Sequence, residues 1–153
     1  MEDIEQRFAA FGKALRHGSF DFPVDPEGWA AELIAAHVIM SNDLLTDAAR
    51  ALWTGREPAY DNRPTHDGEA LREVLIRTGS LDELADEVER SASDLQAAYG
   101  MLLPELRQAP MSTRIVHEGE PLLEGARPIG STIQQNAGAH LDGHLAQLLE
   151  LRE

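Results

Sequence analysis

The chain has 153 residues, a formal net charge of −14 at pH 7 and no cysteine. This length fits a single domain over residues 1 to 153, the negative charge argues against binding to nucleic-acid phosphates, and the lack of cysteine excludes disulfides, thiolate ligands and a cysteine nucleophile. No apolar run reaches the length of a membrane span and the N-terminus does not resemble a signal peptide, so we expect a cytoplasmic protein without a membrane partner.

Helical periodicity dominates the first third of the chain. An apolar stripe over residues 4 to 15 predicts a helix that ends at Gly18. Asp25 is a suitable N-cap and Pro26 a suitable first-turn residue for a second helix, whose apolar stripe continues to about Trp53. The sequence therefore predicts two amphipathic helices in this part.

The middle of the chain begins with turn-forming residues. Residues 54 to 67 contain two prolines and several polar turn formers, which predicts a long loop, and residues 69 to 77 predict a short helix. Ser80 and Glu83 match a capping box that opens a third long helix. Pro104 removes a backbone donor and is expected to kink or end that helix just before it.

The last third combines a short β-prone stretch with another helix. Residues 111 to 128 predict a small hairpin or an irregular excursion. Ser131 and Gln134 match a second capping box, which predicts a fourth helix that continues to the C-terminus. Four amphipathic helices predict an all-α protein that folds as a helix bundle, with the long loop after the second helix and the excursion before the fourth.

Two histidines of the fourth helix carry the first indication of function. His140 and His144 are four residues apart, so both imidazoles project from one face of the helix. A shared metal ion is the simplest reason for two such side chains. The residues between them are Leu141, Asp142 and Gly143, so the helix-borne glutamate of the HExxH metalloproteases is missing.

A third histidine lies on the core-facing stripe of the second helix. His37 is the natural third ligand, and Ser41, one turn later, is expected to border the same cavity. A polar seam along the fourth helix is formed by Asn136, His140, His144 and Gln147. Such a seam implies a wet functional cavity or a set of partners that satisfy one another. Of the other histidines, His17 and His66 are expected to be exposed, as is His117 unless the hairpin brings it to the bundle mouth.

Three neutral imidazoles restrict the choice of metal. They suit zinc, nickel, iron or copper, with zinc and nickel preferred, and they disfavour magnesium and calcium. Three protein ligands leave an open position, where a divalent ion can bind water or a thiolate. A purely structural alternative keeps the histidines as hydrogen-bonded core residues without a metal.

Two short motifs resemble the DinB-like superfamily, which includes the mycothiol-dependent maleylpyruvate isomerases and the bacillithiol transferases. They are GWAAELIAAH, in which Gly28 and Trp29 precede His37, and HLDGHLAQ, in which His140, His144 and Gln147 fit the pattern HxxxHxxQ. The resemblance implies an up-and-down four-helix bundle with one divalent metal on three histidines. It often implies a low-molecular-weight thiol as well. In the isomerase branch one ligand is a glutamate at the position of His140, so this chain is more similar to the three-histidine branch.

Two functions of different classes follow. The first is a metal-dependent enzyme acting on a small molecule, either a transferase of a thiol such as mycothiol or bacillithiol or a hydrolase, with Asn136 and Gln147 orienting ligands. The second is a non-catalytic bundle that binds a metal or small ligand, as a sensor or stress-related protein. A homodimer through apolar residues such as Trp53, Met101 and Met111 is a further possibility.

Overall fold

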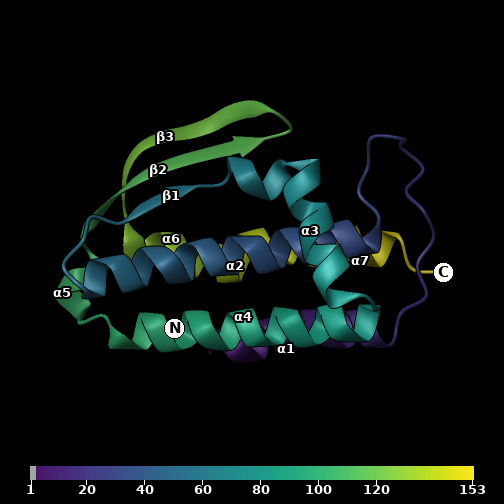
Figure 1. The fold of residues 1–153 in the computed structure, drawn as a ribbon, viewed down its shortest axis with the longest axis horizontal. Helices are drawn as coiled ribbons and strands as arrows, with labels where there is room; N and C mark the ends of the chain where they lie inside the picture. Colours follow the sequence, from purple (N-terminus) through teal and green to yellow (C-terminus); the bar gives the residue numbers. More distant parts are fainter. Residues whose placement is uncertain (1–2) are drawn as a thin grey trace.

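The computed structural model describes residues 3 to 153 as a mostly helical protein with a small sheet (Figure 1). The elements in chain order are α1 (Ile4–Arg16), α2 (Ala31–Trp53), β1 (Ala59–Asp61), a 3-10 turn (Arg63–His66), α3 (Gly68–Thr78), α4 (Leu81–Met101), α5 (Pro104–Arg107), β2 (Pro110–His117), β3 (Glu120–Pro128), α6 (Ile129–Gln135), a π-turn (Asn136–His140) and α7 (Leu141–Glu150). No helix in this range is long and apolar enough to cross a membrane.

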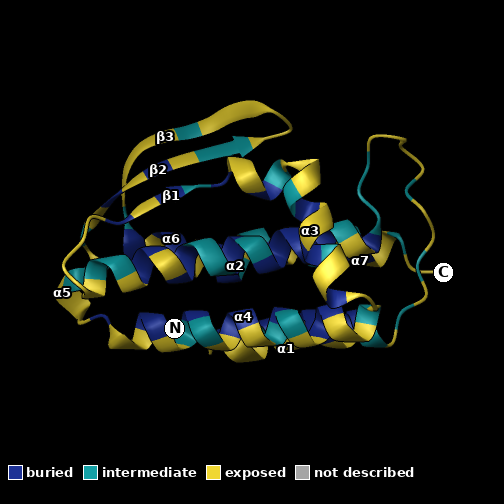
Figure 2. Ribbon diagram, in the orientation of Figure 1, coloured by how far each residue is buried: buried dark blue, intermediate teal, exposed yellow. Residues whose placement is uncertain are grey.

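The long helices α1 and α2 each pack against α4, and the C-terminal segment lies against α1 and α2. Their inward faces are buried and their outer faces exposed (Figure 2). Asp3 caps α1 by accepting hydrogen bonds from two backbone amides, and Ser80 Oγ accepts from the Glu83 amide at 3.1 Å, as the sequence predicts for the start of α4. The predicted end of α4 before Pro104 is also confirmed.

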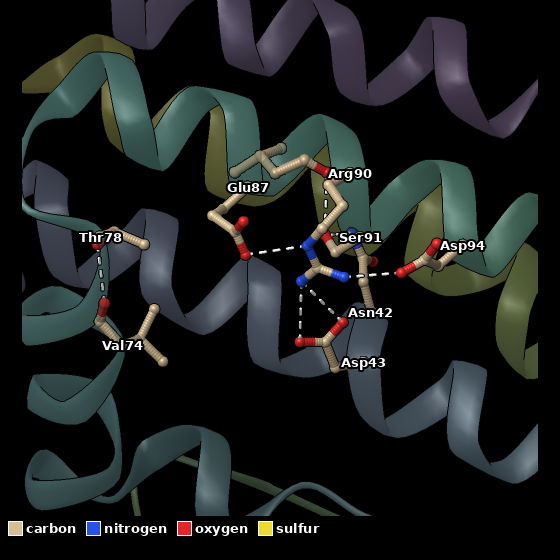
Figure 3. Close-up of polar contacts among 9 residues, drawn as sticks. Asn42, Asp43, Val74, Thr78, Glu87, Arg90, Ser91 and Asp94 are labelled. Carbon is tan, nitrogen blue, oxygen red and sulfur yellow. Dashed lines mark hydrogen bonds and ion pairs between the residues drawn. The ribbon is translucent and has the colours of Figure 1, made fainter.

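Ion pairs connect the surfaces of neighbouring helices. Arg90 of α4 contacts Glu87 and Asp94 of its own helix and Asp43 of α2 (Figure 3). Beneath this group, the Asn42 side chain donates to Ser91 Oγ at 3.0 Å (Figure 3). Exposed ion pairs of this kind contribute little stability, so we assign the adhesion of α2 to α4 mainly to their buried apolar faces.

The predicted fold is confirmed only in part: the protein is mostly helical, but residues of the expected loop and excursion form a three-stranded sheet, so it is not all-α. Its order is β1-β2-β3, with β1 parallel to β2 and β2 antiparallel to β3. Strand β1 has only three residues and pairs with a strand about fifty residues later, so no local periodicity could reveal it. The sheet covers the side of α2 that faces away from α4 (Figure 1).

The predicted excursion is a hairpin, longer than expected, with one shift of register between Ile115 and Val116. His117 pairs with Glu120, so Glu118 and Gly119 form a two-residue turn. Both turn residues have positive φ, 52° and 80°, which is the requirement of a type I′ turn. The turn matches the right-handed twist of the strands and therefore allows the hairpin to extend over strands of eight and nine residues.

Two predicted helix starts are wrong. Helix α2 begins at Ala31, because Asp25 caps a local turn through the Glu27 amide instead of a helix. Helix α6 begins at Ile129, directly after β3, and the Ser131 hydroxyl donates to the Pro128 carbonyl inside the first turn. In both places the side chain of the expected cap residue bonds a backbone group two or three residues away and does not cap the start of a helix.

The C-terminal helix is interrupted, although the sequence predicts one continuous helix. The π-turn Asn136–His140 separates α6 from α7, and Gly138 within it has the non-helical angles φ −102° and ψ −106°. A π-turn has more residues per turn than an α-helix. The helix face that a spacing of 3.6 residues predicts for α6 therefore does not continue into α7.

Candidate metal centre

Three histidines from two segments meet at one point. His37 comes from the middle of α2, His140 from the end of the π-turn and His144 from the first turns of α7. The Nε2 atom of His140 lies 3.2 Å from that of His37 and 3.1 Å from that of His144. One ligand atom from each residue falls within 4.8 Å of the others, so the three side chains could hold a metal ion.

The outer ring nitrogens of His37 and His144 are held by oxygen acceptors. His37 Nδ1 donates to the Thr65 carbonyl at 2.8 Å, and His144 Nδ1 donates to Gln147 Oε1 at 3.0 Å. The backbone carbonyl of Asn136 acts on the His140 ring and partly offsets the lowering of its pKa. Because carbonyl oxygens accept only, His37 and His144 carry their ring hydrogens on Nδ1 and present lone pairs at Nε2.

The geometry and chemistry of this donor set fit a divalent transition metal. The Nε2 atom of His140 lies 3.2 and 3.1 Å from the Nε2 atoms of His37 and His144, which carry lone pairs, and a single ring hydrogen could bridge only one of these two contacts. Bonds of about 2.0–2.1 Å from three imidazoles to one tetrahedral ion place the nitrogens about 3.4 Å apart. The observed distances of 3.2 and 3.1 Å are close to this value. Oxygen acceptors behind the ligating rings are also usual in metal sites.

Burial keeps the three imidazoles neutral. It lowers the pKa of His37 to about 2 and that of His140 to about 3, and charge repulsion from neighbouring histidines lowers both further. Burial also lowers the pKa of His144. Since a metal binds the neutral ring, the site needs no deprotonation at neutral pH.

The sequence predicts that His66 is exposed, and this prediction is wrong. Its half-buried ring lies 5.0 Å from the His37 ring and 5.5 Å from the Trp29 ring, measured between centroids. The 3-10 turn that carries His66 is placed by the parallel pairing of β1 with β2, for which the sequence holds no local pattern. His117 is exposed, and a positive charge on it would lower the pKa of His66, His140 and His144.

Ser41 and Asn136 lie near the cluster and make hydrogen bonds to other groups. The Ser41 hydroxyl donates to the His37 carbonyl at 2.9 Å and is also bonded to the phenol of Tyr60 on β1. Asn136 Nδ2 donates to Asn42 Oδ1 at 2.9 Å, and Asn42 donates onward to Ser91. The side-chain amide of Asn136 therefore points to Asn42, and only the backbone of Asn136 acts on the candidate ligand His140.

Replacing Asn42 by alanine is expected to lower the free energy of unfolding by about 2–4 kcal/mol. The change leaves two buried groups, the Asn136 amide and the Ser91 hydroxyl, without this partner. Denaturant unfolding measures the effect, with alanine at exposed Gln135 as the control. A loss below about 0.5 kcal/mol, typical of a surface position, would contradict this role.

These observations define the protein as a mostly helical chain with a three-histidine cluster that could hold a metal ion. A family model described as mycothiol maleylpyruvate isomerase N-terminal domain matches residues 1–119. The chain therefore belongs to this DinB-like family. The match includes His37 and ends before His140 and His144. No curated protein and no solved structure was found to match the chain.

Proposed function

We propose that this protein is a metal-dependent enzyme in which His37, His140 and His144 bind one divalent transition ion, zinc or nickel, through their Nε2 atoms. The observation that supports this proposal most strongly is the convergence of three Nε2 atoms, with the Nδ1 atoms of His37 and His144 donating to oxygen acceptors. Three ligands leave a position for an exogenous group, where a bound ion lowers the pKa of water or of a thiol.

A low-molecular-weight thiol is the proposed co-substrate, because the family is named for a mycothiol-dependent activity. In such a transfer, the thiol sulfur forms a bond to the electrophilic carbon, the thiol proton passes to solvent and the bond to the leaving group breaks. The isomerase reaction itself is not proposed, since His140 stands where that branch has a glutamate. Hydrolysis would use the same open position with water in place of the thiol.

The test uses protein purified without a histidine tag. We expect about one equivalent of zinc or nickel per chain. We also expect the metal-loaded protein to accelerate the loss of free thiol when mycothiol or bacillithiol is mixed with model electrophiles. Absence of bound metal, even after metal is supplied, would contradict the proposal.

A non-catalytic metal- or ligand-binding protein is the second candidate. One observation favours it: among the described residues the cluster able to hold a metal consists of histidines only, with no carboxylate to act as a general base. Metal-bound protein that is inert with every thiol and electrophile would support this candidate. A single domain, a cytoplasmic location and a homodimer stay predictions.

Replacing Gln147 by leucine is expected to weaken metal binding by roughly 10–100-fold, as removal of an outer hydrogen-bond partner commonly does. The leucine removes the acceptor at 3.0 Å that holds the His144 ring. Competition with a chromogenic chelator measures the affinity. Glutamate at the same position keeps an acceptor and serves as the matched control; equal affinities for the two variants would contradict the role of this oxygen.

A further inference from the structure

His66 is not one of the three candidate metal ligands, but its ring contacts the ring of one of them, His37. Its ring contacts those of His37 and Trp29, which also contact each other at 5.0 Å. A proton on His66 would lower the pKa of His140, and a proton on His144 would lower the pKa of His66. Because His37 is buried while His66, His140 and His144 are half-buried, His66 borders the solvent-facing side of the cluster.

Asn62 determines which nitrogen of His66 carries the hydrogen. Its Oδ1 accepts from the Val116 amide at 2.7 Å, and its Nδ2 donates to the Val116 carbonyl at 3.0 Å. These two bonds leave only one orientation for the buried Asn62 amide. The same Nδ2 lies 3.4 Å from His66 Nε2, so Nε2 accepts and Nδ1 carries the hydrogen.

The Nδ1–H of His66 is a donor that no acceptor of the described chain uses, since the Asn62 contact at Nε2 is the one hydrogen bond that the ring makes. The ring is held on three sides, by Asn62, Trp29 and His37. A free donor on a ring that contacts a candidate ligand is available to an acceptor that arrives from outside. An anion bonded to the ion would be such an acceptor.

We propose that His66 is a catalytic residue that donates a hydrogen bond from Nδ1 to an anionic group, a thiolate or hydroxide, bound at the open position beside His37, His140 and His144. This inference rests on the proposed metal site. His66 would stabilise the bound anion, while the other three histidines would bind the metal ion. A hydrogen bond to a charged group corresponds to roughly a 10–100-fold change in affinity.

The experiment is a titration of the cobalt(II)-loaded protein with azide, an anion that accepts hydrogen bonds, followed by visible absorbance. His66→Phe keeps a ring of similar size against Trp29 and His37 but lacks the N–H. We expect it to bind cobalt as the wild type does and azide roughly 10–100-fold more weakly. His66→Gln retains an N–H donor and is expected to stay within about threefold of the wild type. His17→Phe, at an exposed position outside the cluster, is the matched control and should bind azide normally.

Each outcome decides the proposal. Azide affinity of His66→Phe equal to that of the wild type would overturn it, as would a loss of cobalt from this variant, because His66 would then support the site itself. Wild-type protein that takes up no cobalt would refute the proposed function before azide is added. Should His66→Phe fail to fold, His66→Leu makes the same comparison, since it also lacks the N–H.

Discussion

Replacing His140 by alanine is expected to abolish binding of the divalent metal. His140 is the central member of the cluster, because its Nε2 lies 3.2 Å from that of His37 and 3.1 Å from that of His144. Without it, two imidazoles remain, and the loss should exceed the roughly 10–100-fold that removal of an outer partner causes. Elemental analysis of tag-free protein measures the metal content, and melting with and without added zinc measures its effect on stability.

The control for this experiment is alanine at His17. This histidine is exposed at the end of α1 and takes no part in the cluster. The His17 variant should keep the metal content of the wild type and the same increase in melting temperature with zinc. An unchanged metal content in the His140 variant would show that the ion binds elsewhere.

Acidification from pH 7 to pH 5 is expected to lower the unfolding free energy of the metal-free protein by about 4 kcal/mol. The folded chain lowers the pKa of His37 to about 2 and of His140 to about 3, from an ordinary value near 6.5. Between these values the unfolded chain binds more protons than the folded chain, so stability falls as pH falls. The stabilisation is fully present above pH 6.5 and decreases by about 1.4 kcal/mol per pH unit for each histidine below it.

Urea unfolding of chelator-treated protein at pH 7, 6 and 5 measures this dependence. A His37→Leu, His140→Leu double variant is the control, since it has neither titrating group and should show a much smaller slope over the same range. Most carboxylates titrate below pH 5 and contribute little there. Equal stability of the wild-type chain at pH 7 and pH 5 would show that these histidines take up protons in the folded state as readily as in the unfolded state, which would contradict their lowered pKa values.

Helical periodicity was sufficient to place the three histidines but not their surroundings. His37, His140 and His144 lie on inward-facing stripes, and a spacing of four residues puts the last two on one face. The π-turn at Gly138 could not be predicted, because its backbone depends on packing of the C-terminal segment against α1 and α2. As a result the Asn136 side chain bonds Asn42 in the interior.

The part of the site formed by the sheet also lay beyond local sequence patterns. Thr65, whose carbonyl holds His37, and His66 belong to a 3-10 turn that follows the three-residue strand β1. That turn is positioned by non-local contacts, including the bonds of Asn62 to Val116 on β2. Turn-rich composition predicted a loop here, but such composition carries no information about which distant strand the loop will pair with.

The family match and the site geometry support different candidate ligands. Residues 1–119 establish membership of the family and include one candidate ligand, His37. The other two candidates, His140 and His144, lie in the C-terminal helical segment and are supported by the distances between ring nitrogens and by the acceptor of His144. Measurement of the metal at its ligands would therefore test the segment that the comparison does not reach.

An anomalous difference map at the zinc or nickel absorption edge, from crystals of tag-free protein, would show whether a metal ion binds at the three histidines. We expect one peak at about 2.0–2.1 Å from the Nε2 atoms of His37, His140 and His144. No peak after metal is supplied, or a peak bonded to other residues, would contradict the proposed metal site.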